Sequence, residues 1–146
     1  MRTDEAPIVI DEVFNQPVEK VWNAITDLAL MKQWYFENLP EFKPVVGFET
    51  CFEVQSGERI FPHRWTVTEV IPLKKISYRW RYDGYTGDSL LTMELFPEGE
   101  STRLVLTHQV LENFSDDIPE FKRESGVEGW NFFIRQRLKE FLEKET

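Results

Sequence analysis

The sequence predicts an α+β fold in which a curved antiparallel sheet of about six strands wraps around a long carboxy-terminal helix. Three features predict it: an amphipathic segment at 125–143, a series of alternating segments at 48–110, and two short helical segments at 18–34. The apolar face of a helix and that of a sheet are stable when they bury each other. The 146 residues are enough for one domain, which we expect to span residues 1–146.

The segment 125–143 carries the clearest helical signal. Its apolar residues recur every three or four positions, as one face of a helix requires. They are Val127, Trp130, Ile134, Leu138 and Phe141. Ser125 followed by Glu128 matches a capping box, which predicts that the helix begins there. Because large aromatic side chains need a broad apolar surface, we expect this face to pack on a sheet.

The amino-terminal part predicts one strand and two short helices. Residues 6–14 alternate loosely between apolar and acidic side chains, as a strand would. Pro17 suits the first turn of a helix, and residues 18–26 follow with helical spacing. We expect Asp27 to end this helix and to begin a second one over 28–34.

Five further segments alternate with a period of two, which is typical of half-buried strands. Short connections rich in Gly, Pro, Asp and Ser separate them, so we expect hairpins and an antiparallel meander. The expected strands are 48–54, 60–71, 76–82, 90–96 and 103–110. Residues 111–124 are expected to form a loop with one helical turn.

Composition narrows the classes of partner. The chain has 26 acidic and 17 basic residues, a net charge of −9, which opposes binding to a nucleic acid backbone. A single cysteine, Cys51, excludes an internal disulfide and a site with several cysteine ligands. We expect no metal and no cofactor. Without a leader pattern or an apolar stretch of membrane-spanning length, the sequence predicts a cytoplasmic protein with no membrane span.

Several segments resemble, in order, a known family. They are FNQPVEKVWNAIT at 14–26, Trp34, VTEVIPLKKISYRW at 67–80, TRLVLTH at 102–108, and the Gly-Trp pair at 129–130. They look like the homologues of the activator of the heat-shock protein 90 ATPase, within the START and Bet v 1-like (SRPBCC) group. The resemblance implies the helix-grip fold. It also implies a wide choice of functions, since the group includes lipid and hormone binders, aromatic cyclases and chaperone regulators.

Strand phase predicts which side chains face the interior, because successive residues alternate between the two faces. With a tight turn at 72–74, one row across the sheet is expected to contain Trp65, Trp80, Leu91 and His108. His63 is expected near Tyr82 in the neighbouring row. Each histidine is then either a core residue bonded to a hydroxyl or carbonyl, which we favour, or a ligand or acid/base group.

Three residues of the final helix are notable. Arg137 falls on the apolar side, where a cation costs free energy unless it is paired or solvated. It either anchors an anionic head group in a wet cavity, extends to the helix edge, or binds a carboxylate such as Glu94. Gly126 and Gly129 share one flank, where they either let the helix approach a strand closely or leave room for a pocket entrance.

From these features we expect binding, without catalysis, of a small hydrophobic molecule, lipid-like or aromatic, in a cavity between sheet and helix. The candidate ligand-binding residues are Trp34, His63, Trp65, Trp80, Tyr82, Leu91, His108, Trp130, Ile134 and Arg137. One alternative is a cyclase or hydrolase in which His63 or His108 transfers a proton. Another is a module that binds a chaperone or a second copy of itself.

Overall fold

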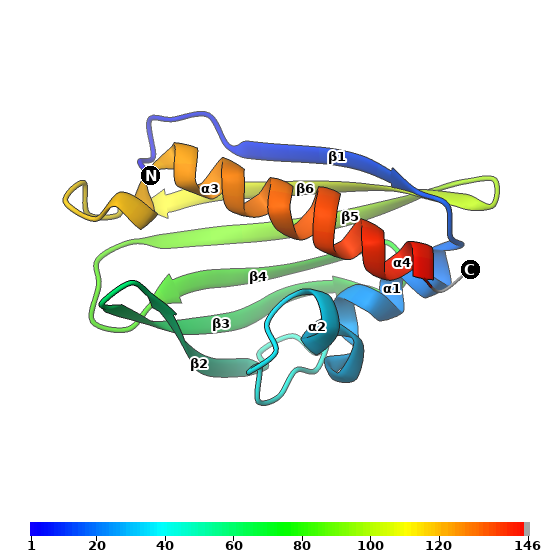
Figure 1. Ribbon diagram of the computed structural model, residues 1–146, viewed down its shortest axis with the longest axis horizontal. Coiled ribbons are helices and arrows are strands. Elements are labelled where there is room, and N and C mark those ends of the chain that lie inside the picture. Colours follow the sequence, from blue (N-terminus) through cyan, green and yellow to red (C-terminus); the bar gives the residue numbers. More distant parts are fainter. Residues whose placement is uncertain (145–146) are drawn as a thin grey trace.

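The computed structural model describes residues 1–144 and contains one six-stranded antiparallel sheet (Figure 1), as predicted. The strand order is β1-β6-β5-β4-β3-β2, so the first strand pairs with the last and the others form a meander. The strands are β1 (Ile8–Phe14), β2 (Glu49–Ser56), β3 (Arg59–Ile71), β4 (Lys75–Tyr82), β5 (Asp88–Glu98) and β6 (Ser101–Glu112).

Two short helices follow β1, as predicted: α1 (Val18–Thr26) and α2 (Leu28–Trp34). Asp27 ends the first and begins the second, because its carboxylate accepts a hydrogen bond from the Leu30 N–H at 3.3 Å. In the loop after β6, a single turn of 3-10 helix forms at η1 (Pro119–Phe121).

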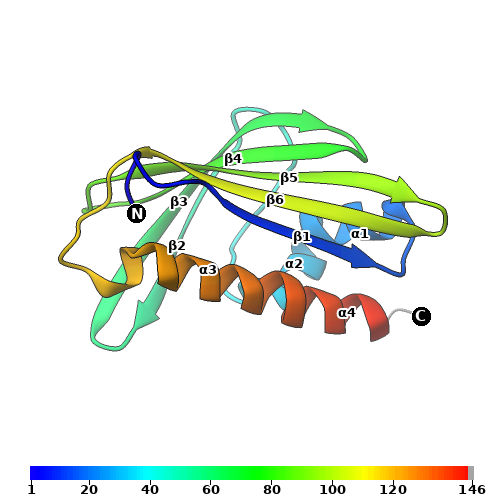
Figure 2. The ribbon, with the colours of Figure 1, turned by 90° about the horizontal axis from the view of Figure 1, so that it is seen from above.

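The final helix crosses the concave face of the sheet (Figure 2). It consists of α3 (Arg123–Trp130), a π-helical part η2 (Asn131–Leu138), and α4 (Lys139–Lys144). The predicted capping box is wrong, since the helix begins before Ser125 and no side chain caps it. The Gly126 N–H already bonds to the Lys122 carbonyl at 3.1 Å, which places Ser125 inside the first turn, where an N-cap residue cannot lie.

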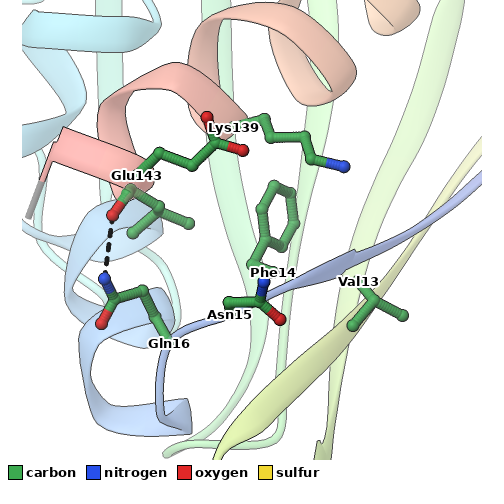
Figure 3. A pocket seen from close by; sticks show the side chains of 7 residues that line it. Val13, Phe14, Asn15, Gln16, Lys139 and Glu143 are labelled. Atoms are coloured by element: carbon green, nitrogen blue, oxygen red, sulfur yellow. Dashed lines mark hydrogen bonds between the residues drawn. The ribbon is translucent and has the colours of Figure 1, made fainter. Parts of the chain in front are cut away.

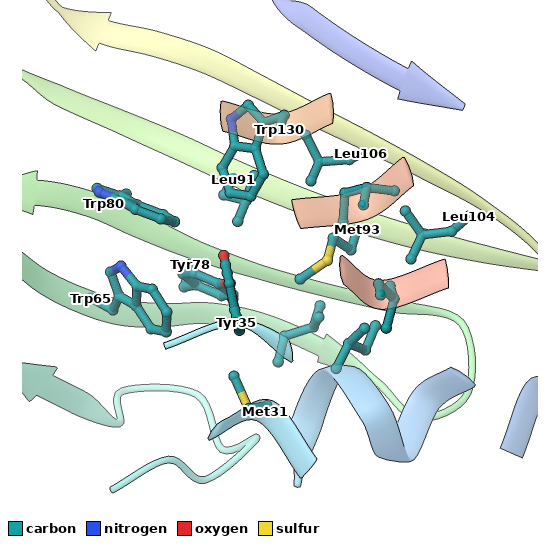
Figure 4. Close-up of a cluster of buried hydrophobic side chains, with 14 of the residues drawn as sticks. Met31, Tyr35, Trp65, Tyr78, Trp80, Leu91, Met93, Leu104, Leu106 and Trp130 are labelled. Carbon is teal, nitrogen blue, oxygen red and sulfur yellow. The ribbon is translucent and has the colours of Figure 1, made fainter. Parts of the chain in front are cut away.

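Most of the space between helix and sheet is filled by side chains (Figure 4). Trp65 and Leu91 from the sheet, Met31 from α2 and Ile134 from the helix are all 0% exposed. Tyr35 joins this core to the sheet through a hydrogen bond of 2.8 Å between its hydroxyl and that of a β4 tyrosine. Room for a ligand is therefore found at the margins of the helix rather than in a central cavity.

The observed register confirms three predicted pairs: Trp65 with Trp80, His63 with Tyr82, and Leu91 with His108. The predicted step from Trp80 to Leu91 is wrong, because Trp80 pairs with Ser89. β5 begins at Asp88, two residues earlier than expected, after a turn with two positive-φ glycines. Since a shift of two residues keeps every side chain on its face, Leu91 and His108 still point into the interior.

Candidate functional site

Two neighbouring hollows border the final helix. The inner hollow, of about 140 Å³, is lined by Met1, Trp80, Tyr82, His108, Glu120, Ser125, Gly126, Gly129, Trp130 and Phe133. The outer groove, of about 390 Å³, is lined by Tyr35, Phe36, Glu37, Asn38, Glu53, Val54, Gln55, Phe132, Phe133 and Arg137. Because Phe133 contributes to both, the two spaces lie on either side of one side chain.

A third hollow, of about 60 Å³, lies between the end of β1 and α4 (Figure 3). Gln16 occupies its floor, where its Nε2 donates a hydrogen bond of 2.9 Å to the Leu142 carbonyl. This bond fastens the end of the helix to the chain after β1. The space suits a few water molecules rather than a ligand.

The two helix glycines have different roles. A Cβ atom built on Gly126 would lie 2.9 Å from Ile8 Cδ1 and 3.3 Å from Met1 Sδ, so this glycine lets the helix approach β1 closely. A Cβ atom on Gly129 would meet nothing within 4 Å. Each of the two alternatives considered from the sequence therefore applies, one to each glycine, and the inner hollow is the space that Gly129 leaves.

His108 ties the final helix to the sheet through both ring nitrogens. Trp130 Nε1 donates to its Nδ1 at 3.0 Å, and because an indole nitrogen only donates, the ring proton must lie on Nε2. Nε2 then donates to Ser89 Oγ at 2.8 Å, whose own hydroxyl donates to the Trp80 carbonyl at 2.7 Å. Burial, with a smaller effect from the positive amino terminus, lowers the pKa of His108 to about 4. The ring is thus neutral and fully bonded.

His63 uses only one of its two ring nitrogens in a hydrogen bond within the described residues. Its Nδ1 lies 2.8 Å from the Phe61 carbonyl and donates to it, while its Nε2 makes no hydrogen bond to the described residues. The ring packs against two aromatic side chains. Its centroid lies 5.6 Å from that of Phe36 and 4.7 Å from that of Tyr82. Burial lowers its pKa to about 4, although the bond to Phe61 acts in the opposite direction. His63 is therefore a neutral acceptor packed between Phe36, which lines the outer groove, and Tyr82, which lines the inner hollow.

The inner hollow has aromatic walls. Trp80 and Trp130 meet edge to face with centroids 5.3 Å apart, and Tyr82 continues the wall along β4. Burial raises the pKa of Tyr82 to about 12, so its phenol stays protonated. The Trp80 indole N–H partly offsets this rise, although it makes no hydrogen bond of normal geometry within residues 1–144. The walls are apolar, and the indole nitrogen of Trp80 is the one buried polar wall atom without a partner in residues 1–144.

Five of the predicted ligand-binding residues line a hollow and five do not. Trp80, Tyr82, His108 and Trp130 line the inner hollow, and Arg137 lines the outer groove. Trp34, Trp65, Leu91 and Ile134 are fully buried in the packed core, and His63 borders neither hollow directly. Strand phase gave the correct face for the sheet residues, but phase does not reveal which inward side chains are covered by others.

Arg137 lies at the helix edge, where it is half-buried. Its Nη2 donates to the Gln33 carbonyl at 2.8 Å, and its guanidinium carbon lies 5.8 Å from the centre of the Phe132 ring. Of the alternatives considered from the sequence, a bond from Arg137 to Glu94 is absent from the described residues, and the position at the helix edge is the one observed. Glu94 lies opposite Lys75 of β4 and directly follows the buried Met93 in β5. Because successive strand residues point to opposite faces, Glu94 lies on the outer face of the sheet.

Parts of the site carry no periodic signal in the sequence. Met1 and Glu120 reach the inner hollow from the chain's start and from η1, and Glu37 and Asn38 reach the outer groove from the loop after α2. Phe133 could be recognised as a flank of the helical stripe, but its position between two hollows depends on the fold. Within residues 1–144, no helix is long and apolar enough to cross a membrane.

Comparisons with known proteins agree with this architecture. Residues 15–143 match the family model described as Activator of Hsp90 ATPase homolog 1-like protein. No curated protein matches the chain. Among solved structures, protein Mll3558 from Rhizobium loti has a TM-score of 0.77 and 22% identity, over 93% of this chain and 96% of that chain.

Two further structures are similar in fold. The Aha1 dimer from Colwellia psychrerythraea has a TM-score of 0.74 and 21% identity, over 95% of this chain and 97% of that one. DynU16, a protein of the dynemicin biosynthetic locus, has a TM-score of 0.75 and 23% identity, over 97% of this chain but 49% of its own. At these identities the likeness shows the helix-grip fold.

Proposed function

Because the chain belongs to the Activator of Hsp90 ATPase homolog 1-like family, whose fold generally binds hydrophobic ligands, we propose that it binds a small hydrophobic molecule, aromatic or lipid-like, without catalysing a reaction on it. The apolar part of this ligand occupies the inner hollow. Aromatic walls with a few polar atoms at the rim are usual for such sites.

The observation that carries this proposal is the empty space at Gly129. A helix residue without a side chain faces a hollow of about 140 Å³ between Trp80, Tyr82 and Trp130. An apolar cavity of about 150 Å³ in another protein holds a benzene molecule. The inner hollow therefore has the volume and the lining for one aromatic ring or the end of an alkyl chain.

The histidines favour binding over proton transfer. Both nitrogens of His108 are bonded to protein groups, so it has no lone pair or proton left for a substrate. His63 is the group on which the enzymatic alternative rests, because its Nε2 is an unpaired acceptor. It lines neither hollow, however, and a general base must come within hydrogen-bond reach of its substrate.

A titration followed by tryptophan fluorescence tests the proposal, since Trp80 and Trp130 both line the inner hollow. Phenol, indole, toluene and octan-1-ol are suitable probes. We expect saturable binding of at least one of them by the wild type. Gly129→Leu should fill the hollow and weaken that binding at least tenfold, whereas Gly129→Ala, which adds one methyl group, should weaken it less.

Thermal unfolding of both variants provides the folding control. A Cβ atom at Gly129 meets open space, so Gly129→Ala should not lower stability, and the leucine variant is compared with it. If no probe binds the wild type, the proposal is wrong. It is also wrong if a probe binds equally well to a folded Gly129→Leu protein.

A further inference from the structure

A row of three helix residues connects the two hollows. Gly129 faces the inner hollow, Phe133 contributes to both, and Arg137 lines the outer groove. They are spaced four positions apart, so they lie on one flank of the helix. Phe133 and Arg137 lie in the π-helical part η2, which rises less per residue than an α-helix, so the axial distance from Gly129 to Arg137 is below the ~12 Å that eight α-helical residues span. The row thus marks a short path along the helix from an apolar space to a cation.

Only side chains separate the two spaces. Phe133 is half-buried and packs edge to face on Tyr35, with centroids 5.1 Å apart, and against Phe36, also at 5.1 Å. Packing against neighbouring aromatic rings holds its ring, so a ligand can displace it by replacing those contacts. It also lies in the π-helical part of the helix, a backbone form often found at functional sites. A ligand that moves this ring would join the inner hollow to the outer groove.

Arg137 has capacity for an anion. It forms no ion pair with any residue in 1–144, and one hydrogen bond, from Nη2 to the Gln33 carbonyl, is recorded for its five N–H groups. That bond and the Phe132 ring hold the guanidinium in place. Its helix neighbour Arg135 differs, because it bonds to Asn131 and lies 3.8 Å from a carboxylate oxygen of Glu12.

Glu37 and Glu53 also line the outer groove and oppose an anion there. Both are exposed, however, whereas Arg137 is half-buried. Water screens exposed charges most strongly. For an anion in direct contact with Arg137, attraction by the less hydrated guanidinium should therefore outweigh repulsion by the two exposed carboxylates. The two carboxylates would then weaken the binding of an anion without preventing it.

We propose that the ligand is an amphipathic monocarboxylate whose apolar tail lies in the inner hollow and whose carboxylate pairs with Arg137. This inference rests on the proposed function and adds to it the chemical class and orientation of the ligand. A carboxylate accepts two hydrogen bonds from a guanidinium in a planar arrangement, which a neutral head group cannot reproduce. The tail must reach from the inner hollow to Arg137, eight residues further along the helix than Gly129, as an alkyl or arylalkyl chain of medium length does.

Octanoate and octan-1-ol form a matched pair of probes, since they differ mainly in the charge of the head group. By calorimetric titration at neutral pH, we expect the wild type to bind octanoate more tightly than octanol. Arg137→Gln should weaken octanoate binding about tenfold to a hundredfold, which corresponds to about 1.5–3 kcal/mol for a hydrogen bond to a charged group. Octanol binding should change little.

Arg135→Gln is the matched control, because it removes the same charge from the same helix on another face. It should keep the preference for octanoate. Arg137→Lys should keep part of it, and Glu53→Gln should increase the affinity for octanoate. Thermal unfolding checks that loss of the Gln33 bond has not disturbed the fold.

Equal affinity of the wild type for octanoate and octanol would overturn the inference, as would an unchanged preference in folded Arg137→Gln protein. In either case, binding of octanol or an aromatic probe that Gly129→Leu abolishes would leave the proposed function intact. If no probe binds the wild type, both are wrong.

Discussion

At the scale of single residues, His108 has the most specific surroundings. The hydrogen bonds from Trp130 through His108 and Ser89 to the Trp80 carbonyl join the final helix to three strands. The sequence could place His108 on the inner face, because strand phase requires only alternation. It could not reveal the hydrogen-bond partners. These lie on the final helix, β5 and β4, and tertiary packing decides how the three elements are positioned.

We expect His108→Leu to destabilise the protein by about 1–3 kcal/mol, because the buried Trp130 N–H would lose its acceptor. Urea unfolding of the wild type and the variant measures this loss. In a double-mutant cycle with Trp130→Phe, the combined loss should be smaller than the sum of the single losses. Equal stability of His108→Leu and wild type would contradict this role of His108.

The two histidines also predict a dependence of stability on pH. Their pKa values are about 4 in the folded protein, against an ordinary value of 6.5. Below pH 6.5 the unfolded chain takes up protons that the folded protein does not, so the contribution is complete above pH 6.5 and decreases as pH falls toward 4. At about 1.4 kcal/mol for each pKa unit, each histidine should account for a loss of about 3 kcal/mol in the free energy of unfolding between pH 7 and a pH below 4.

Urea unfolding at pH 7 and pH 5 measures this dependence. His63→Leu should reduce the slope in this pH range by about half, since one of the two titrating groups is removed. A wild-type stability that is constant between pH 6.5 and pH 5 would show that the histidines are not kept neutral by burial.

At the scale of elements, the final helix shows what sequence patterns can predict. The spacing of its apolar residues identified the helix and its buried face correctly, because burial repeats with the helical period. The capping box was misleading, since η1 and Lys122 start the helix from the preceding turn. The outer groove was beyond prediction, because the loop after α2, β2 and the final helix meet there without any shared pattern.

The two glycines of α3 provide a prediction at this scale. Gly129→Ala should raise the free energy of unfolding by up to about 1 kcal/mol, because alanine favours a helix more than glycine does and its methyl group meets open space. Gly126→Ala should gain less or lose stability, since its methyl group must displace Ile8 Cδ1. Thermal or urea unfolding of the two variants gives the comparison, and a greater gain at Gly126 would contradict the packing described.

At the scale of the whole molecule, the two edges of the sheet differ. Along β1, Arg123 donates to the Ala6 and Pro7 carbonyls, and Arg135 donates to the Asp11 carbonyl at 3.5 Å. Along β2, Asn38 donates to the Glu53 carbonyl. The final helix thus covers one edge, while the other depends on a loop. We expect β2 amides to exchange with deuterium faster than β1 amides, which mass spectrometry of peptides can measure.

The pairing of β1 with β6 has a consequence for how the chain is made. β1 leaves the ribosome before the strands of the meander, but its partner strand and the helix that covers it follow more than eighty residues later. The hairpins from β2 to β5 can form as they emerge, because each strand neighbours the next. β1, with Ile8 and Ile10 on one face, must wait. Until β6 emerges, the nascent chain therefore carries an unpaired apolar strand, a segment prone to aggregation.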